Sequence, residues 1–530
     1  MAVGTPVSRS VTSSTSPHAN PLGPWISGVV AAGAGLAAGE IAAIPVSPDA
    51  SPYFAVGSSV VDHSPEAVRE WAIETFGAAD KVALFLGMGL LIAIIAAVAG
   101  SLEHRRPPVG SLLIAVFGGV GVVAALDRPG AVWTHALPSV IAAAVGVVVL
   151  RILVAQCRSG QYEEQSELRV GVNGNAPLTR RFILTAGGVS VAAVALGVIG
   201  RRMLADTAET LADRARLMLP RPVRPAPPVP EGTRLDVDGV TPFVTDNDAF
   251  YRIDTALQVP TLTTAGWRLR IHGDVERAVV LSWDDLLAMP MVERYVTLAC
   301  VSNDVGGDLI GNARWLGVPM RDVLDLAGVR PGADLLLSTS ADGWTCGTPI
   351  SAIADGRDAL LAVGMNGDPL PVEHGYPVRQ VVPGLYGYVS ATKWVVDWEV
   401  TRFSEAEAYW TSRGWSALGP IKLSSRIDRP DPGRYPAGEV VIAGTAWAQH
   451  TGVDRVEVRI DGGEWRPADL AAEYSVDTWR QWRYVWQAAP GDHVVEVRAI
   501  DRLGRPQVER YRPPAPDGAT GLDERRYTIT

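Results

Sequence analysis

The chain has 530 residues, of which 47% are hydrophobic, and a formal net charge of −10 at pH 7. This length exceeds one ordinary domain, and the positive mean hydropathy argues against a protein that is soluble throughout. The 57 acidic and 47 basic residues include no dense Lys/Arg run, so we expect no nucleic-acid partner.

Apolar runs crowd the N-terminal third, each close to the length of about 20 residues that a bilayer-spanning helix needs. We count five and predict an α-helical membrane bundle over 26–202 that follows a cytoplasmic tail, 1–25. Glu40 weakens the first run, because an acid at membrane depth indicates either a polar bundle interior or a span shifted outward. The runs are Ile26–Val46, Lys81–Gly100, Val109–Leu126, Leu137–Ala155 and Phe182–Gly200.

The basic residues of the loops indicate orientation, because cytoplasmic loops are enriched in Lys and Arg. One side holds only Arg69, Lys81 and Arg128, so the other side, with the N-terminus, is predicted to be cytoplasmic. Five crossings then place everything after Gly200 on the extracytoplasmic face of a multi-pass protein of the cytoplasmic membrane. The richer side holds Arg9, Arg105, Arg106, Arg158, Arg169, Arg180 and Arg181.

A paired arginine precedes the fifth run, in Thr179–Leu184. It resembles a twin-arginine export signal, which serves folded and cofactor-loaded proteins. The alternative is that Arg180 and Arg181 are ordinary positive-inside anchors.

Proline and arginine alternate from Met218 to Pro230, so we predict a stiff Pro-rich linker over 203–232. Strand-like runs and short helical patterns follow and predict a mixed α+β domain over 233–417. The strands are expected at Trp267–His272, Val279–Ser282 and Tyr295–Ala299, and the helices at Asp284–Met289 and Met320–Ala327.

Short alternating strands separated by glycine-containing turns fill residues 418–530. This pattern favours an immunoglobulin-like sandwich, and no cysteine is present there to link its sheets. The strands are expected at Val440–Ala446, Val453–Asp461, Arg483–Gln487 and His493–Ile500.

Cys300 follows an apolar strand-like run and precedes a loop that contains Gly306 and Gly307. A thiol at the end of an extended segment can meet a bound cofactor, and a soft thiolate suits a metal centre. We therefore take Cys300 as the candidate metal ligand. The alternatives are an inert buried cysteine and a disulfide with Cys346, another of the three cysteines.

Five motifs occur in one order and resemble the sulfite oxidase family of molybdopterin oxidoreductases. The resemblance runs from about Thr233 to the C-terminus and does not include the membrane part. The motifs are Thr297–Cys300, Arg314–Gly317, Met365–Pro371, His374–Arg379 and Val382–Gly387.

The resemblance implies one molybdenum held by the dithiolene of a single pterin and by the Cys300 thiolate. It implies that His374, Arg379 and Lys393 contact the cofactor, and a guanidinium suits its phosphate. Asn303 matches a family position and is expected to order the loop. The alternative roles are a helix-capping histidine for His374 and surface salt bridges for Arg379 and Lys393. The C-terminal region resembles the family's dimerisation domain, which implies a homodimer.

The substrate side departs from the family pattern, because Asp304 and Val305 replace basic residues that follow the ligand cysteine. A family tyrosine beside the metal aligns with Trp415, whose indole donates a hydrogen bond but does not ionise. An upstream family arginine aligns with either Arg252 or Ile253. Sulfite is therefore doubtful, and we expect a small oxyanion or a sulfoxide-like substrate.

The eight histidines all lie outside the centres of the five apolar runs, so we expect no haem held by paired imidazoles within the bundle. No Cys-x-x-Cys-His sequence occurs either. The electron partner is then a separate protein or a quinone. Two hypotheses follow: a membrane-anchored molybdenum oxidoreductase that transfers an oxygen atom in either direction, or a binding protein that kept the fold without activity. The sequence leaves the direction of the reaction open.

Overall fold

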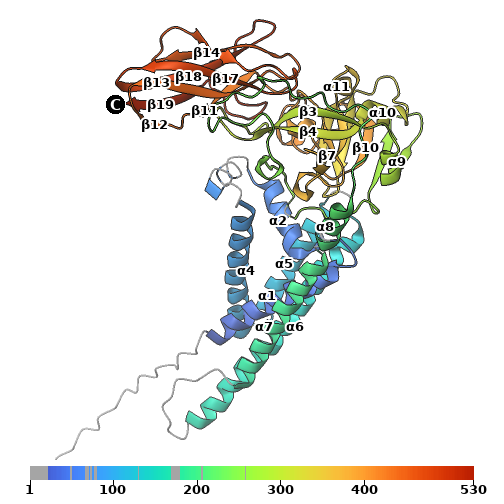
Figure 1. The fold of residues 1–530 in the computed structure, drawn as a ribbon. Coiled ribbons are helices and arrows are strands. Elements are labelled where there is room, and N and C mark those ends of the chain that lie inside the picture. The colour runs from blue at the N-terminus through green and yellow to red at the C-terminus, as the bar shows by residue number, and fades with distance from the viewer. Residues whose placement is uncertain are drawn as a thin grey trace, which may run out of the picture. The chain divides into compact units, whose positions relative to one another are not determined.

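The computed structural model describes residues 22–204 and 207–530, except 48–49, 66–67, 69–70, 72–74, 77–79, 129–130, 169–179 and 257. The predicted export signal begins at Thr179, outside these residues. The chain forms two compact units, Met1–Ala205 and Asp206–Thr530 (Figure 1).

The first unit is helical, and four of its helical stretches have the length and apolarity to cross a membrane: Leu22–Ala43, Lys81–Arg105, Val109–Leu126 and Trp133–Arg158. The fifth predicted run is helical too, but its apolar stretch, Arg181–Ala195, is shorter. The described helices are α1 (Leu22–Ala43), α2 (Pro52–His63), α4 (Asp80–Arg105), α5 (Val109–Leu126), η3 (Trp133–Ala136), α6 (Leu137–Leu168) and α7 (Arg180–Leu204).

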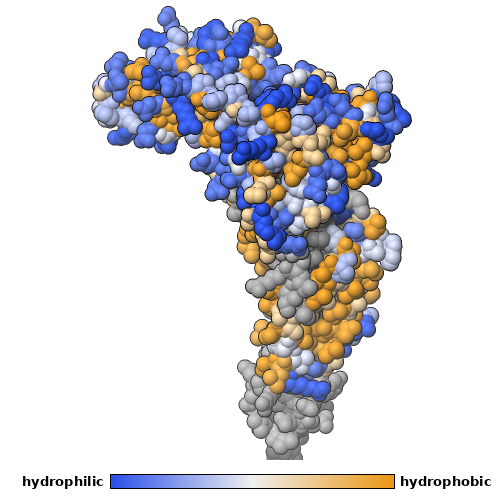
Figure 2. Space-filling view, turned by 45° about the vertical axis from the view of Figure 1, so that its right-hand side comes forward, coloured by the Kyte–Doolittle hydropathy of each residue, from blue (hydrophilic) through white to orange (hydrophobic). Residues whose placement is uncertain are grey.

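Large apolar side chains cover the outside of this unit (Figure 2). Leu86 and Leu90 of α4 are 71% and 66% exposed, and Val123 of α5 is 69% exposed. Such a surface is unfavourable in water and suits a hydrocarbon environment. Glu40 is instead buried in α1, where its carboxylate accepts a hydrogen bond from the Ser51 hydroxyl at 2.6 Å. Glu40, which interrupts the first apolar run, therefore points into the interior of the helical unit and not to its surface.

Glycines allow α1 to approach its neighbours closely. A Cβ at Gly28 would lie 1.8 Å from the Ala96 carbonyl oxygen of α4, and one at Gly35 would lie 2.5 Å from the Ala142 carbonyl oxygen of α6. Helices in lipid commonly associate through such small residues, since close backbone approach maximises van der Waals contact.

We predict that Gly28→Ala lowers the stability of the helical unit by about 1–3 kcal/mol, because the added methyl overlaps the α4 backbone. Gly33→Ala is the control, since nothing lies within 4 Å of a Cβ at Gly33. Thermal unfolding of the detergent-solubilised protein measures both. Equal unfolding temperatures for the two variants would contradict the packing described.

The second unit begins with short helices and two sheets. The sheet ordered β2-β1-β10-β5-β6 is mixed, because β1 and β10 run parallel, whereas the sheet ordered β3-β4-β7-β8, with β9 paired to β7, is antiparallel. Strand β7 is buried along its whole length, as expected of its apolar sequence LLAVGM. The elements are α8 (Thr207–Arg216), η4 (Asn247–Ala249), β1 (Arg268–Gly273), β2 (Val279–Ser282), α9 (Trp283–Leu287), β3 (Val292–Ala299), β4 (Ile310–Pro319), α10 (Met320–Asp325), β5 (Leu335–Ser340), β6 (Thr345–Pro349), α11 (Ile350–Ala354), β7 (Leu360–Met365), β8 (Asp368–Pro369), η5 (Val372–His374), β9 (Arg379–Val381), η6 (Gly387–Val389), β10 (Val395–Thr401) and η7 (Thr411–Arg413).

Residues 418–530, predicted as a separate domain and called the C-terminal β-domain below, belong to the same compact unit and contain two further sheets, ordered β11-β13-β17-β16 and β12-β19-β18-β14-β15. Side chains of both sheets share one core, which includes Trp482 and Val497. The turn after β14 places Asp461 and Gly462 at φ of 53° and 67°, a conformation that asparagine, aspartate and glycine tolerate best. The strands are β11 (Ser424–Arg429), β12 (Gly433–Tyr435), β13 (Gly438–Trp447), β14 (Val453–Ile460), β15 (Arg466–Pro467), β16 (Asp469–Leu470), β17 (Arg480–Ala488), β18 (Gly491–Asp501) and β19 (Asp523–Ile529).

Much of the segment predicted as a free linker is attached to the second unit. Asp213 of α8 accepts hydrogen bonds from the Tyr376 hydroxyl and the Thr264 amide, both at 2.7 Å. Arg214 donates to the Leu370 carbonyl at 2.8 Å. Helix α8 is thereby fixed to the loop that leads from β8 to β9.

Candidate cofactor site

Cys300 lies directly after β3, at the start of a loop whose two ends are joined by hydrogen bonds. The Cys300 amide donates to the Leu309 carbonyl at 2.9 Å, and the Leu309 amide donates to the Asn303 side-chain oxygen at 2.8 Å. The Ser302 amide points at the Cys300 sulfur from 3.4 Å. Asn303 therefore orders the loop, which holds the thiol at a fixed place.

Residue Cys300 is partly exposed, whereas Cys346 is fully buried, and neither is in a disulfide. Burial by surrounding groups raises the pKa of the Cys300 thiol, and hydrogen bonds from Ser302 together with the charge of Lys393 oppose that rise. A bound metal would supply a positive charge next to the sulfur, which would stabilise the thiolate form of Cys300.

Three basic side chains converge near this thiol. The Arg379 guanidinium donates to the His374 carbonyl at 3.0 Å and stacks over Trp315 at 5.0 Å from the ring centre. His374 contacts the Asn247 carbonyl through Nε2 at 3.2 Å. The Lys393 ammonium donates to the Glu373 carbonyl at 3.2 Å. The loop from β8 to β9 and the segment before β10 thus bring the three together.

Burial destabilises the charged forms of these three side chains, as their pKa values show. Desolvation, together with the charges of Arg379 and Lys393, lowers the pKa of His374 to about 3. Desolvation also lowers the pKa of Arg379 to about 10 and that of Lys393 to about 8. Buried cations of this kind require an anion nearby.

Asp254 supplies part of that negative charge. Its buried carboxylate accepts from Lys393 Nζ at 2.8 Å and from Arg252 Nε at 2.9 Å. The Arg252 charge helps to lower the pKa of His374 and Lys393, so Arg252 belongs to this electrostatic cluster. The Asp254 carboxylate carries one negative charge, whereas Lys393, Arg252 and Arg379 carry three positive charges. These residues together therefore have an excess of positive charge.

Two tyrosines near Cys300 were not singled out from the sequence. Burial and the neighbouring Cys300 raise the pKa of Tyr251, and burial raises that of Tyr386 to about 12, with Cys300 contributing. Tyr386 lies in the Val382–Gly387 motif, so its position in that motif could have marked it as a site residue. Both phenols stay protonated at neutral pH and are hydrogen-bond donors.

Trp415 belongs to an aromatic cluster with Trp410 and Tyr388. Its ring centre is 6.1 Å from that of Trp410 and 5.9 Å from that of Tyr388. The Tyr388 hydroxyl donates to the Ser416 carbonyl at 2.7 Å, which fixes the segment that carries Trp415. Tyr388 lies two residues after Tyr386, and the two phenols interact electrostatically.

A cavity of about 1100 Å³ adjoins Asn247. Its lining includes Asp246, Asp248, Asp368 and Glu373 but only two arginines. This excess of carboxylates does not suit a phosphate, so the cluster around Arg379 remains the anion site.

The C-terminal β-domain forms hydrogen bonds with β3, an end strand of its sheet, at Thr297, three residues before the thiol. The Thr297 amide donates to the Asp477 carbonyl at 3.0 Å, and the Thr297 hydroxyl accepts from the Trp479 amide at 2.8 Å. The Gln449 side-chain amide donates to the Thr297 carbonyl. Strand β3 therefore continues its hydrogen bonding into the next domain.

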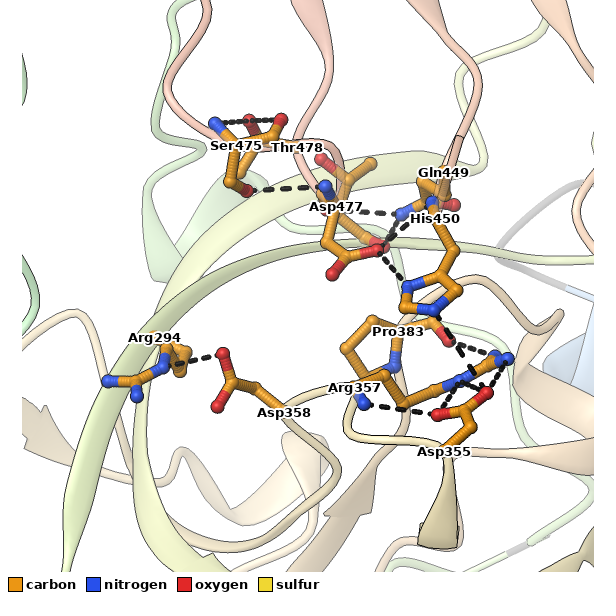
Figure 3. Close-up of polar contacts among 11 residues, drawn as sticks. Arg294, Asp355, Arg357, Asp358, Pro383, Gln449, His450, Ser475, Asp477 and Thr478 are labelled. Carbon is orange, nitrogen blue, oxygen red and sulfur yellow. Dashed lines mark hydrogen bonds and ion pairs between the residues drawn. The ribbon is translucent and has the colours of Figure 1, made fainter. Parts of the chain in front are cut away.

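A second contact of this domain reaches the segment before Tyr386. The His450 ring lies between Asp477, at 3.4 Å, and Asp355, at 4.0 Å (Figure 3). Arg357 binds Asp355 at 2.6 Å and donates to the Pro383 carbonyl at 2.8 Å. The β-domain thus supports both segments that lead to the thiol and to Tyr386.

Comparison with known proteins identifies the class of site. The family "oxidoreductase molybdopterin binding domain" matches residues 256–410. The uncharacterized oxidoreductase YuiH of Bacillus subtilis is 33% identical over 153 residues, which are 29% of this chain and 74% of YuiH. Rat mitochondrial sulfite oxidase is 32% identical over 293 residues, 46% of this chain and 52% of the rat protein. The chain spans about half the length of the sulfite oxidases it matches.

Among solved structures, the sulfane dehydrogenase SoxCD of Paracoccus pantotrophus matches with a TM-score of 0.48 and 24% identity, over 55% of this chain and 81% of that one. The family match and the sequence relatives define an oxidoreductase with a molybdenum–molybdopterin cofactor. The chain belongs to the sulfite oxidase family of molybdopterin-dependent oxidoreductases.

The residues present fit that cofactor. Arg379 and Lys393 are buried cations, and the Asp254 carboxylate is shared between Lys393 and Arg252, so the cluster keeps a positive charge that suits the phosphate of a pterin. The Cys300 thiol interacts electrostatically with Lys393, and residue Cys300 is partly exposed.

We predict that Thr297→Val lowers the free energy of unfolding by about 1–3 kcal/mol, because the buried Trp479 amide loses its acceptor. Thr297→Ser keeps the hydroxyl and is the matched control. Urea unfolding followed by tryptophan fluorescence measures the difference. Wild-type stability in the valine variant would show that the bond to β3 is unimportant.

We also predict that cofactor binding weakens as pH rises through 8. Lys393, with a pKa of about 8, is charged below that pH and neutral above it, and an anion prefers the charged form. Binding of isolated molybdopterin to apoprotein should be about 10-fold weaker at pH 9 than at pH 7. Lys393→Arg, which remains charged, should flatten the profile; an unchanged profile would contradict the assignment.

Proposed function

We propose that the protein is a membrane-anchored oxidoreductase that uses molybdenum–molybdopterin for two-electron oxygen-atom transfer on the extracytoplasmic side. One arrangement carries the proposal: the Cys300 thiol interacts electrostatically with Lys393, which shares a buried cluster with Arg379, and Asp254 offsets only part of the charge of that cluster. Family membership supports the pterin cofactor as the anion that this cluster binds.

Each residue then has a defined task. The bound cofactor supplies the exchange of an oxygen atom and two electrons. Cys300 is the protein ligand to the metal, and Asn303 fixes the loop that presents it. Arg379 and Lys393 neutralise the phosphate and orient the pterin. His374, neutral at pH 7 because its pKa is about 3, contributes hydrogen bonding rather than charge.

The substrate is proposed to be a small oxyanion or a sulfoxide-like molecule rather than sulfite. Asp304 occupies a position near the thiol where the family has a basic residue, and its carboxylate accepts from the Tyr511 hydroxyl at 3.2 Å. The remaining candidate for a substrate-binding cation, Arg252, is paired with Asp254. A dianion would therefore meet little compensating positive charge. Trp415 is proposed to shape this side through its indole, and reduction of a sulfoxide-type substrate is the alternative direction.

The rest of the proposal concerns partners. Four long apolar helical stretches favour membrane anchoring. Helix α7 is proposed as the fifth crossing, and with it the Lys/Arg distribution favours an extracytoplasmic site. A separate electron-transfer protein or a quinone is proposed as redox partner. The C-terminal β-domain, proposed to be immunoglobulin-like, is the proposed surface for a homodimer. A non-catalytic binding protein with this fold would have no use for the buried cations.

We predict that the full chain, produced in a host that makes the cofactor, binds molybdenum in a stoichiometric amount. Cys300→Ser should abolish turnover and leave the fold intact, because the serine hydroxyl is a poor replacement for a soft thiolate ligand. Metal analysis, circular dichroism and a screen of oxyanions and sulfoxides with an artificial electron mediator test this. A wild-type protein without molybdenum would favour the binding-protein alternative, and an active serine variant would refute the choice of ligand.

A further inference from the structure

The helical unit contains a cavity of about 340 Å³ where α4 ends, α5 begins and α6 leaves its apolar stretch. Its lining includes Glu103, Pro107 and Pro108 on one side and Arg151 and Arg158 of α6 on the other. The two arginines are seven residues apart, so they share one face of the helix and are separated by about 10 Å along its axis.

Arg151 lies inside the apolar stretch Trp133–Arg158, and its side chain is 59% exposed. Its Nε donates to the Ser111 hydroxyl at 3.1 Å and is 3.9 Å from the nearer oxygen of Glu103. An arginine at this depth is costly unless its guanidinium reaches the interface or an anion. The long ion pair to Glu103 compensates only part of its charge.

Glu103 has a second task that fixes its position. Its buried carboxylate accepts from the Ser111 amide at 2.8 Å, in the first turn of α5. A carboxylate at a helix N-terminus is stabilised by the unpaired amides there. One carboxylate at most neutralises one of the two arginines.

Among the residues that the structure describes, the hydrogen-bond partners of Arg158 are uncharged. Its Nη2 donates to the Glu103 and His104 carbonyls, both at 2.6 Å, at the end of α4. Backbone carbonyls position a guanidinium but carry no net charge. The cavity therefore has two fixed guanidinium groups and one carboxylate, with exposed Arg105 and Arg106 close by in the sequence.

We propose that this cavity binds the phosphate of an anionic phospholipid between Arg151 and Arg158. The proposal rests on the membrane anchoring proposed above. The ends of three apolar stretches meet here, which is the level of lipid headgroups. Val148 and Ile152, 56% and 48% exposed on the same helix, offer an apolar surface for the acyl chains. Basic pockets between membrane helices on the cytoplasmic side bind anionic headgroups in this way.

The test uses the full chain in a non-ionic detergent with three probes: phosphatidylglycerol, inorganic phosphate and a diacylglycerol without phosphate. Phosphatidylglycerol should raise the unfolding temperature and remain bound in native mass spectrometry. The other two probes should do neither at equal concentration. Replacing both arginines, Arg151→Gln with Arg158→Gln, should weaken lipid binding about 10-fold to 100-fold.

Arg128→Gln is the control, because Arg128 pairs with Asp62 at 3.4 Å and does not line the cavity. It should retain the lipid effect. Equal lipid effects in the double variant and the wild type would overturn the proposal, as would an equal effect of free phosphate or of diacylglycerol. Carbonate-washed membranes separate the two proposals: a chain that stays in the membrane without lipid selectivity refutes only the lipid site, whereas a chain that washes off refutes the anchoring.

Discussion

Burial of positive charge is the constraint on which the catalytic unit depends. Arg379 and Lys393 are placed where water cannot solvate them, and the Asp254 carboxylate, which also binds Arg252, offsets only part of their charge. Removing charged groups from water costs several kcal/mol per ion unless an opposite charge compensates. A bound anion recovers that energy, so folding stability and cofactor binding are thermodynamically linked in this unit.

The site is also not contained within one domain. Strand β3 is an edge strand, and the bonds to Thr297 from Gln449, Asp477 and Trp479 complete it. His450 extends the same contact toward the segment before Tyr386. A domain that the sequence suggests for dimerisation thus has a second part to play, since it fixes the strand that ends at the thiol.

The sequence predicts the helices and strands, which depend on neighbouring residues, better than the contacts between distant segments. Alternation with glycine turns located β14 and β18 to within about two residues, and apolar length located α4, α5 and α6. The basic cluster was predicted only through a resemblance, because no periodic pattern brings His374 and Lys393 together. Asp254 and the Thr297 contacts escaped prediction since they join segments more than 130 residues apart. The close approach of Gly28 to α4 was likewise invisible, because a glycine in an apolar run has several explanations.

Helix α8 has a practical implication. Asp213 and Arg214 fasten it to the loop that carries His374, and Tyr376, whose hydroxyl reaches Asp213, is fully buried. A water-soluble version of the enzyme would be cut most naturally at the proline-rich stretch, where the sequence suggests a boundary. That cut would remove these hydrogen bonds and loosen the loop that carries His374, so the excised second unit has to retain residues from Thr207 onward.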